Sequence, residues 1–244
     1  MTELKKFVRR YTSISAVIDI LAREELPLLD PQTWDDRNDR YFMSLYKEQK
    51  KLGGLYALCA ARCSETYHHW RVFTGTSDGA CIEIKRNQLE TTLAKLDGVR
   101  FGKVDYLRLD EIEHPTAINL ERMPFVKRTG FTAEEEYRII AETTEDQKSA
   151  LSIEFPHSMI NCIYLNPWLP KSIAESLRDT LRSVPGCSNL RVSRSQLIDS
   201  SRWKRAGDEI VGKKTQKKLV LRAKPKEAKS LSKKPPSKKM ARVR

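Results

Sequence analysis

Three acidic residues in a row, Glu134 to Glu136, precede the apolar stretch Tyr137 to Ile140, which is typical of a buried strand. Because side chains alternate across a strand, Glu134 and Glu136 would share one face, with two carboxylates side by side at its beginning. A fixed anion in a dry pocket stabilises the positive charge that develops when a glycosidic bond breaks. The pair is therefore a candidate for that chemistry; exposed turn charges, or partners for Arg138, are the alternative.

Two arginines near the N-terminus could bind an anionic group. Residues 7–11 alternate enough to form a short strand that carries Arg9, Arg10 and Tyr11. An arginine can hold a phosphate through two hydrogen bonds, and a tyrosine can stack on an aromatic ligand. Successive strand residues face opposite ways, so only one of the arginines can face a cleft. The alternation does not decide between Arg10 and Arg9, and a surface charge is the alternative for either.

Other polar clusters do not have the spacing of known metal sites. Four aspartates lack the regular spacing and the glycine of a calcium loop, so turn and cap roles explain them: Asp30, Asp35, Asp36 and Asp39. Two cysteines precede two adjacent histidines, which is not a common zinc arrangement: Cys59, Cys63, His68 and His69. We therefore expect no metal. Trp34 and Trp70 are expected in the core, because exposing an indole is costly.

The elements that must position these residues alternate along the chain. Apolar residues recur at helical spacing from Ile14 to Leu21, with Ser13 available as the N-cap. Further helical patterns cover residues 41–52, 88–96 and 170–184, and strand patterns cover 55–63, 79–85, 99–107, 137–141, 159–165 and 190–193. The order predicts an α+β fold, a single mixed domain over residues 1–211 with a central split or mixed sheet and flanking helices.

The positive charge is concentrated at the C-terminus. Residues 212–244 contain 14 Lys and Arg and one acid, Glu227, so this segment accounts for the whole net charge of +13. Prolines interrupt it, and its apolar residues are too few to offset the cost of ordering the chain. We predict a disordered Lys-rich tail. Counterion release makes such segments bind RNA or DNA without reading sequence, so nucleic acid is the expected partner; a solubilising extension is the alternative.

Composition also indicates a compartment. No apolar run approaches the roughly 20 residues that span a bilayer, and the first residues lack the long apolar core of a signal peptide. Five cysteines, an odd number without dense spacing, indicate a reducing environment. We expect a cytoplasmic protein with no membrane association.

Five short stretches, in one order, resemble a bacterial domain family of unknown function numbered 2971, over roughly residues 7–205. They are residues 9–13, 30–36, 63–70, 79–84 and 134–140. The Glu-x-Glu formed by Glu134 and Glu136 is also similar to that of ADP-ribosyltransferases, which place an Arg or His on an early strand. Their central Ser-Thr-Ser triplet has no clear counterpart here; the nearest substitutes are Ser64 and residues 74–77.

The second resemblance implies roles for four residues. NAD would be the substrate, with Arg10 on the dinucleotide and Tyr11 stacked on nicotinamide. Glu136 would be the catalytic carboxylate that holds a ribose hydroxyl and stabilises the oxocarbenium ion, and Glu134 would orient the acceptor. The implied activity is an ADP-ribosyltransferase-like enzyme that modifies a macromolecule, with nucleic acid as one acceptor. The resemblances further imply a defence or toxin effector with an antitoxin partner.

Two other functions stay open on the sequence. One is a non-catalytic nucleic-acid-binding or sensor module, in which the tail supplies the affinity. The other is a metal-dependent nuclease, which needs clustered acids. Its ligands would come from Asp30, Asp35, Asp36 and Glu83.

Overall fold

The computed structural model describes residues 6–75, 78–113 and 118–211. The chain divides into two compact units, residues 1–200 and residues 201–244. The described part of the second unit is the helix α7 (Ser201–Ile210) with the residue that follows it. The expected disordered tail, residues 212–244, lies outside the described residues, and the expected domain limit at residue 211 stays a prediction.

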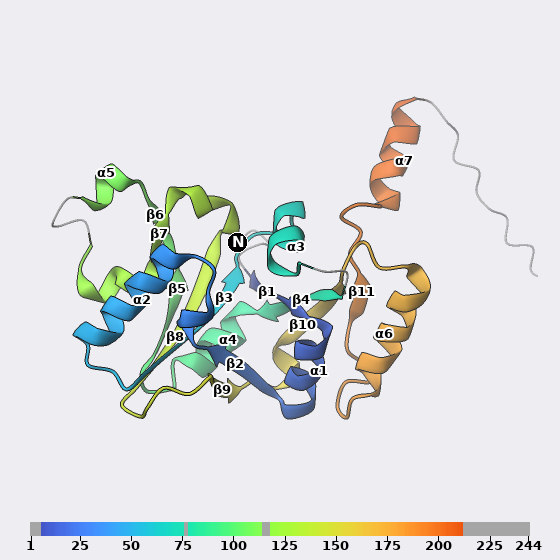
Figure 1. Ribbon diagram of the computed structural model, residues 1–244. Coiled ribbons are helices and arrows are strands. Elements are labelled where there is room, and N and C mark those ends of the chain that lie inside the picture. Colours follow the sequence, from blue (N-terminus) through green and yellow to red (C-terminus); the bar gives the residue numbers. More distant parts are fainter. Residues whose placement is uncertain (1–5, 76–77, 114–117, 212–244) are drawn as a thin grey trace, which may run out of the picture. The chain divides into compact units, whose positions relative to one another are not determined.

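A nine-stranded sheet forms the centre of the first unit (Figure 1). One path through it runs β11-β10-β4-β1-β3-β2-β9; β8 also pairs with β3, and β5 with β8. The strands are β1 (Phe7–Ser13), β2 (Glu25–Leu29), β3 (Gly54–Ala61), β4 (Gly79–Lys85), β5 (Val99–Lys103), β8 (Glu136–Thr143), β9 (Ala150–Glu154), β10 (Ile160–Leu165) and β11 (Val192–Arg194). The β10–β11 pair is parallel and the other pairs are antiparallel, so the sheet is mixed and the predicted α+β class is confirmed.

The sheet is weakly joined on one edge of β3, where β1 and β2 meet that strand. Strand β3 pairs with β8 along its whole length, and β1 pairs with β4 along its whole length. In contrast, β1 meets β3 at the single pair Arg9–Ala61, and β2 meets β3 at the single pair Leu29–Ala57. Between residues 57 and 61, no described strand pairs continuously with this edge of β3, which leaves room for side chains between β1 and β3.

Side-chain caps set the start of two helices of the first unit. Helix α1 (Ile14–Arg23) begins after Ser13, whose hydroxyl accepts a hydrogen bond from the Ala16 N–H at 3.2 Å, as predicted. Helix α2 (Arg37–Gln49) begins after Asp36, whose Oδ1 accepts from the N–H groups of Asn38 and Asp39. The 3₁₀ turn η2 (Pro31–Thr33) begins in the same way after Asp30. The capping role expected for these aspartates is confirmed for Asp30 and Asp36.

The remaining elements surround the sheet. They are α3 (Tyr67–Phe73), α4 (Arg86–Leu93), α5 (Leu109–Ile112), α6 (Lys171–Ser183), the short parallel pair β6 (Asp105–Leu107) and β7 (Val126–Arg128), and the 3₁₀ turns η3 (Leu120–Phe125), η4 (Thr129–Glu134) and η5 (His157–Met159). No helix in the described ranges has both the length and the apolar character of a membrane span.

Among the described residues, three apolar clusters pack the helices against the sheet. The largest lies under α1, α4 and α6 and includes Val17, Leu89 and Leu181. A second packs α2 on β3 and β8. A third lies under α3 and contains Trp70, which is buried as expected, whereas Trp34 is only partly buried.

Several parts of the fold differ from the sequence prediction. Elements α5, β7 and α7 were not predicted, and two further differences concern the strands of the sheet. The stretch 99–107 is not one strand: β5 and β6 belong to different sheets, and the intervening Val104 donates its N–H to the Glu136 carbonyl at 3.0 Å. Strands β2 and β9 were not predicted. They pair with each other over residues 25–29 and 150–154, and the pairing compensates for a pattern that Pro27 weakens.

Candidate active site

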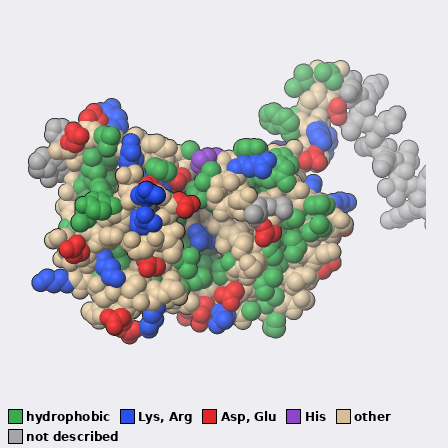
Figure 2. Space-filling model, in the orientation of Figure 1, with side chains coloured by type: hydrophobic (Ala, Val, Ile, Leu, Met, Phe, Trp, Pro, Cys, Tyr) green, Lys and Arg blue, Asp and Glu red, His purple; other side chains and the backbone are tan. Residues whose placement is uncertain are grey.

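A cavity of about 560 Å³ lies at the gap between β1 and β3. Figure 2 shows a hollow on this face of the molecule, with acidic and basic side chains at its edge. The lining comes from β1, the η2–α2 connection, β3, the end of α3, and the segment from β7 to β8. All four candidate residues line it: Arg10, Tyr11, Glu134 and Glu136.

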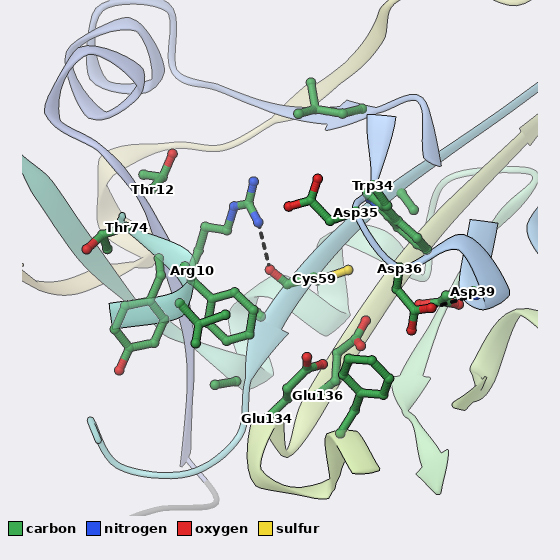
Figure 3. Close-up of a pocket in the computed structure, with 18 of the residues that line it drawn as sticks. Arg10, Thr12, Trp34, Asp35, Asp36, Asp39, Cys59, Thr74, Glu134 and Glu136 are labelled. Carbon is green, nitrogen blue, oxygen red and sulfur yellow. Dashed lines mark hydrogen bonds between the residues drawn. The ribbon is translucent and has the colours of Figure 1, made fainter. Parts of the chain in front are cut away.

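Arg10 bridges the gap between the two strands. Its Nη1 donates to the backbone carbonyl of Cys59 on β3 at 3.0 Å, at a position of β3 that pairs with β8 but not with β1 (Figure 3). In Figure 3 the guanidinium points toward the Cys59 carbonyl. Arg9 also lines the cavity, so the expectation that only one of the two arginines would do so is not met. Its guanidinium is already bound, however: Nη1 donates to the Cys63 carbonyl at 2.6 Å, and Nη2 forms a buried ion pair with Glu83. Of the two arginines, Arg10 is the one that makes no hydrogen bond to a carboxylate of the described residues.

Tyr11 lines the cavity, but its ring packs inward. It stacks on the His69 ring with centroids 5.2 Å apart, and the Trp70 ring meets it edge-on at 5.3 Å. Tyr11 is 5% exposed. One face of the ring that was expected to stack on a ligand therefore packs against His69.

The two candidate carboxylates reach the cavity by an unexpected backbone path. Glu134 ends η4, Glu135 has a left-handed conformation with φ of 41°, and Glu136 begins β8. The expectation that both glutamates lie on one strand face is therefore wrong. The turn at Glu135 brings both side chains to the same cavity, while Glu135 itself stays exposed.

Glu136 is held by Arg138, which is fully buried. Arg138 donates from Nε to Oε1 at 2.6 Å and from Nη2 to Oε2 at 3.0 Å. The same guanidinium donates to both oxygens of Asp39, at 2.9 and 2.6 Å, and to the Pro124 carbonyl at 2.7 Å. Glu136 therefore pairs with Arg138, which was the alternative considered for this triplet. The pairing fixes the Glu136 carboxylate at the cavity wall.

Lys127 supplies the second positive charge. Its Nζ lies 2.7 Å from Glu134 Oε2, 3.6 Å from Glu136 Oε2 and 3.8 Å from Asp39 Oδ2. Three carboxylates therefore share two cations in a buried cluster. No local sequence pattern indicated Lys127 or the pairing of Asp39, because these contacts join β7, α2 and β8.

The pKa values of the two glutamates shift in opposite directions. Burial by itself raises the pKa of Glu136, but the charge and hydrogen bonds of Arg138, together with Lys127, lower it to about 2. For Glu134, burial outweighs Lys127 and raises the pKa above its ordinary value. Glu136 is consequently a stable anion at neutral pH, and Glu134 is the better proton acceptor of the two.

His69 binds the backbone carbonyl of Glu134. Its Nε2 lies 3.0 Å from the Glu134 carbonyl, which can only accept, so Nε2 carries the proton. Its Nδ1 lies 2.5 Å from the Thr66 hydroxyl, which completes the pair of hydrogen bonds. Burial lowers the pKa of His69, which favours the neutral ring that this pattern requires.

The alternative metal ligands are not brought together. Cys63 Sγ lies 3.8 Å from His69 Nε2, but within residues 6–75, 78–113 and 118–211 no group of three or more His, Cys, Asp or Glu has the arrangement of a metal site. The acids of the nuclease alternative are dispersed. Asp30 and Asp36 cap η2 and α2, and Glu83 pairs with Arg9 and accepts from Asn161 at 2.5 Å.

Sequence comparison places the chain in no family. No family model matches it, so the resemblance to the family numbered 2971 is not confirmed, and no curated protein matches it. Among solved structures it is similar to DarT of Thermus sp. 2.9 in complex with ADP-ribosylated ssDNA, at 11% identity and a TM-score of 0.42, covering 79% of this chain and 95% of that chain. Complexes of the same protein with NAD+ and carba-NAD+ give 11% and 12% identity, TM-scores of 0.40, and cover 79% of this chain and 96% of those chains. Likenesses of this size support no conclusion about activity.

Proposed function

We propose that this protein is an ADP-ribosyltransferase that consumes NAD and modifies a macromolecule. The observation that carries the proposal is one cavity that combines a guanidinium from β1 with two carboxylates of opposite pKa shift from the start of β8. Its volume of about 560 Å³ falls within the range of small-molecule sites, about 300–1,000 Å³.

The two glutamates suit the two halves of the reaction. When the bond between ribose C1′ and the nicotinamide nitrogen breaks, nicotinamide leaves with the electron pair and positive charge develops on the ribose. Glu136, ionised and fixed by Arg138, stabilises that charge. Glu134 accepts the proton that the acceptor releases as it attacks C1′, a role that its raised pKa favours.

Arg10 suits the dinucleotide end of the substrate. Its Nη1 is held by the Cys59 carbonyl, and the other donors of the guanidinium can meet a phosphate. Lys127 and Arg138 are positioning residues in this scheme, because they hold the carboxylates and need not touch the substrate. Stacking of Tyr11 on nicotinamide stays a prediction.

We further propose nucleic acid as the acceptor class, since the net charge of +13 favours a polyanionic partner. Modification of nucleic acid in the cytoplasm would block growth. That effect fits a defence or toxin effector controlled by an antitoxin partner.

The test is nicotinamide release and label transfer from labelled NAD, with nucleic acid and cell extract as acceptors. Glu136→Gln should lower turnover by about 10²–10³-fold, the usual effect of removing one group that stabilises transition-state charge. Glu135→Gln is the matched control, because Glu135 is exposed and adjacent, and it should keep full activity. Arg10→Gln should raise KM more than it lowers kcat. A folded wild-type sample that never consumes NAD would rule out the enzyme and favour the non-catalytic binding module.

A further inference from the structure

Helix α3 exposes aromatic side chains next to the cavity. We define the α3 surface as the set Tyr67, His68, Arg71, Phe73 and Trp168. Tyr67 is 56% exposed and Phe73 is 39% exposed, whereas the opposite face of the helix, His69 and Trp70, is buried. Hydrophobic, histidine and basic side chains lie next to one another over α3 in Figure 2. Exposed aromatic rings gathered in one place are a sign of a binding surface.

The rings are held in fixed orientations around Arg71. Its guanidinium carbon lies 3.9 Å from the centroid of the Trp168 ring and 5.3 Å from that of Tyr67. Its Nε donates to the Tyr67 hydroxyl at 3.1 Å, and the Tyr67 and Trp168 rings meet edge-on at 5.4 Å. The surface is therefore built by packing across two segments that are distant in the sequence, and its shape does not depend on a single exposed side chain.

The α3 surface continues from the mouth of the cavity. Phe73 belongs to both, and its neighbours Val72 and Thr74 also line the cavity. The α3 surface itself carries the positive charge of Arg71, and residues 67–73 contain no acid. The nearby Glu65 accepts hydrogen bonds from the indole N–H of Trp70 at 3.0 Å and from the Ser195 hydroxyl at 2.6 Å. A negatively charged partner with flat apolar groups matches this combination.

We propose that the α3 surface binds unpaired bases of a single-stranded nucleic acid, with the bases on the aromatic rings and a phosphate near Arg71. Proteins bind such strands by stacking bases on aromatic side chains beside a positively charged groove. Five side chains suit one or two bases, whereas a stable protein interface uses about 20–30 residues on each side. The role of this surface in presenting the acceptor rests on the proposed transferase function, but the binding itself requires no NAD.

The test measures fluorescence anisotropy of short labelled oligonucleotides with the full-length protein and without NAD. Oligothymidine, oligouridine and an abasic oligomer of equal length carry the same phosphates, so binding through backbone charge alone treats them alike. We expect the protein to bind one or both base-containing strands at least about tenfold more tightly than the abasic strand. A preference between thymidine and uridine strands identifies DNA or RNA as the source of the bases.

Three variants locate the effect. Tyr67→Ala should lower the preference for bases about tenfold and leave the affinity for the abasic strand unchanged. Tyr67→Phe keeps the ring and should keep most of the preference. Tyr41→Ala is the matched control, because Tyr41 is 60% exposed on α2 and does not line the cavity. Melting temperatures check that all three variants fold.

Equal affinity of the wild type for base-containing and abasic strands would overturn the proposal, as would equal losses in Tyr67→Ala and Tyr41→Ala. A concentration-dependent dimer that Tyr67→Ala abolishes would assign the surface to a second copy of the chain instead. The α3 binding site and the transferase activity can be disproved independently of each other. Nicotinamide release without base preference removes the α3 site alone, and base preference without NAD consumption removes the transferase alone.

Discussion

Asp39 and Arg138 are 99 positions apart in the sequence and form a two-bond ion pair with 4% and 0% of their surfaces exposed. Asp39 lies in the first turn of α2, and Arg138 is the third residue of β8. The second carboxylate on the guanidinium, Glu136, faces the cavity. The position of helix α2 therefore affects the orientation of Glu136, the proposed catalytic carboxylate, through Arg138.

Removing the charge of Arg138 should destabilise the fold strongly. In Arg138→Gln, Asp39 and Glu136 stay buried without their cation, and breaking a buried pair in this way costs about 3–5 kcal/mol. Urea unfolding measures the change in the free energy of unfolding. Arg128→Gln, on the exposed part of β7, is the control and should change it by less than about 0.5 kcal/mol. Similar losses in both variants would show that the network is not a stabilising unit.

The contribution of Glu136 should depend on pH. Its pKa is lowered from the ordinary 4.5 to about 2, so the fold favours the anion. That stabilisation is complete above pH 4.5 and is lost as the pH falls toward 2. The difference in unfolding free energy between the wild type and Glu136→Gln should therefore shrink across this window, as measured by urea titrations at a series of pH values. A difference that stays constant with pH would contradict the assigned charge state.

Lys127 should set the acidic limb of the activity profile. Its charge opposes the rise in the pKa of Glu134 that burial causes. In Lys127→Met that pKa should rise further, so the acidic limb of kcat against pH moves to higher pH. Lys127→Arg keeps the charge and should leave the limb near its original position. A limb that does not move in Lys127→Met would exclude Glu134 as the proton acceptor.

The cap of α2 should matter for stability and activity together. Asp36→Ala removes the acceptor for the Asn38 and Asp39 N–H groups, a loss of about 1 kcal/mol. Turnover should fall as well, because the first turn of α2 carries Asp39. Asp35→Ala is the control, because Asp35 is a neighbouring exposed aspartate that does not cap α2. It should leave the melting temperature unchanged. Equal shifts in melting temperature for the two variants would contradict this account.

Local patterns predicted much of the fold. The helix that follows Ser13, strand β4 and helix α6 lie within a residue or two of their predicted bounds, because their signals are contained in the segment itself. The pattern of β2 was too weak to read, since Pro27 interrupts it and its partner β9 lies more than a hundred positions away. Its stability comes from pairing that no local window contains.

The site was predicted only in part, because some of its residues are recognisable from local spacing and others act through long-range contacts. Arg10, Glu134 and Glu136 were chosen by residue type and spacing, and all three line one cavity. Lys127 and His69 were not assigned their roles, because each acts through a contact with Glu134 that the folded chain creates. The signal that could have suggested a buried network was Arg138 itself, a charged residue in the middle of an otherwise apolar strand.

The missing ladder between β1 and β3 has a consequence for ligand affinity. A free arginine side chain samples many rotamers, and fixing it costs up to about 2 kcal/mol of conformational entropy. The hydrogen bond from Arg10 to the Cys59 carbonyl restricts that side chain during folding, before any ligand arrives. An anion that enters the cavity meets a preorganised receptor, so a local defect in strand pairing becomes a gain in binding strength.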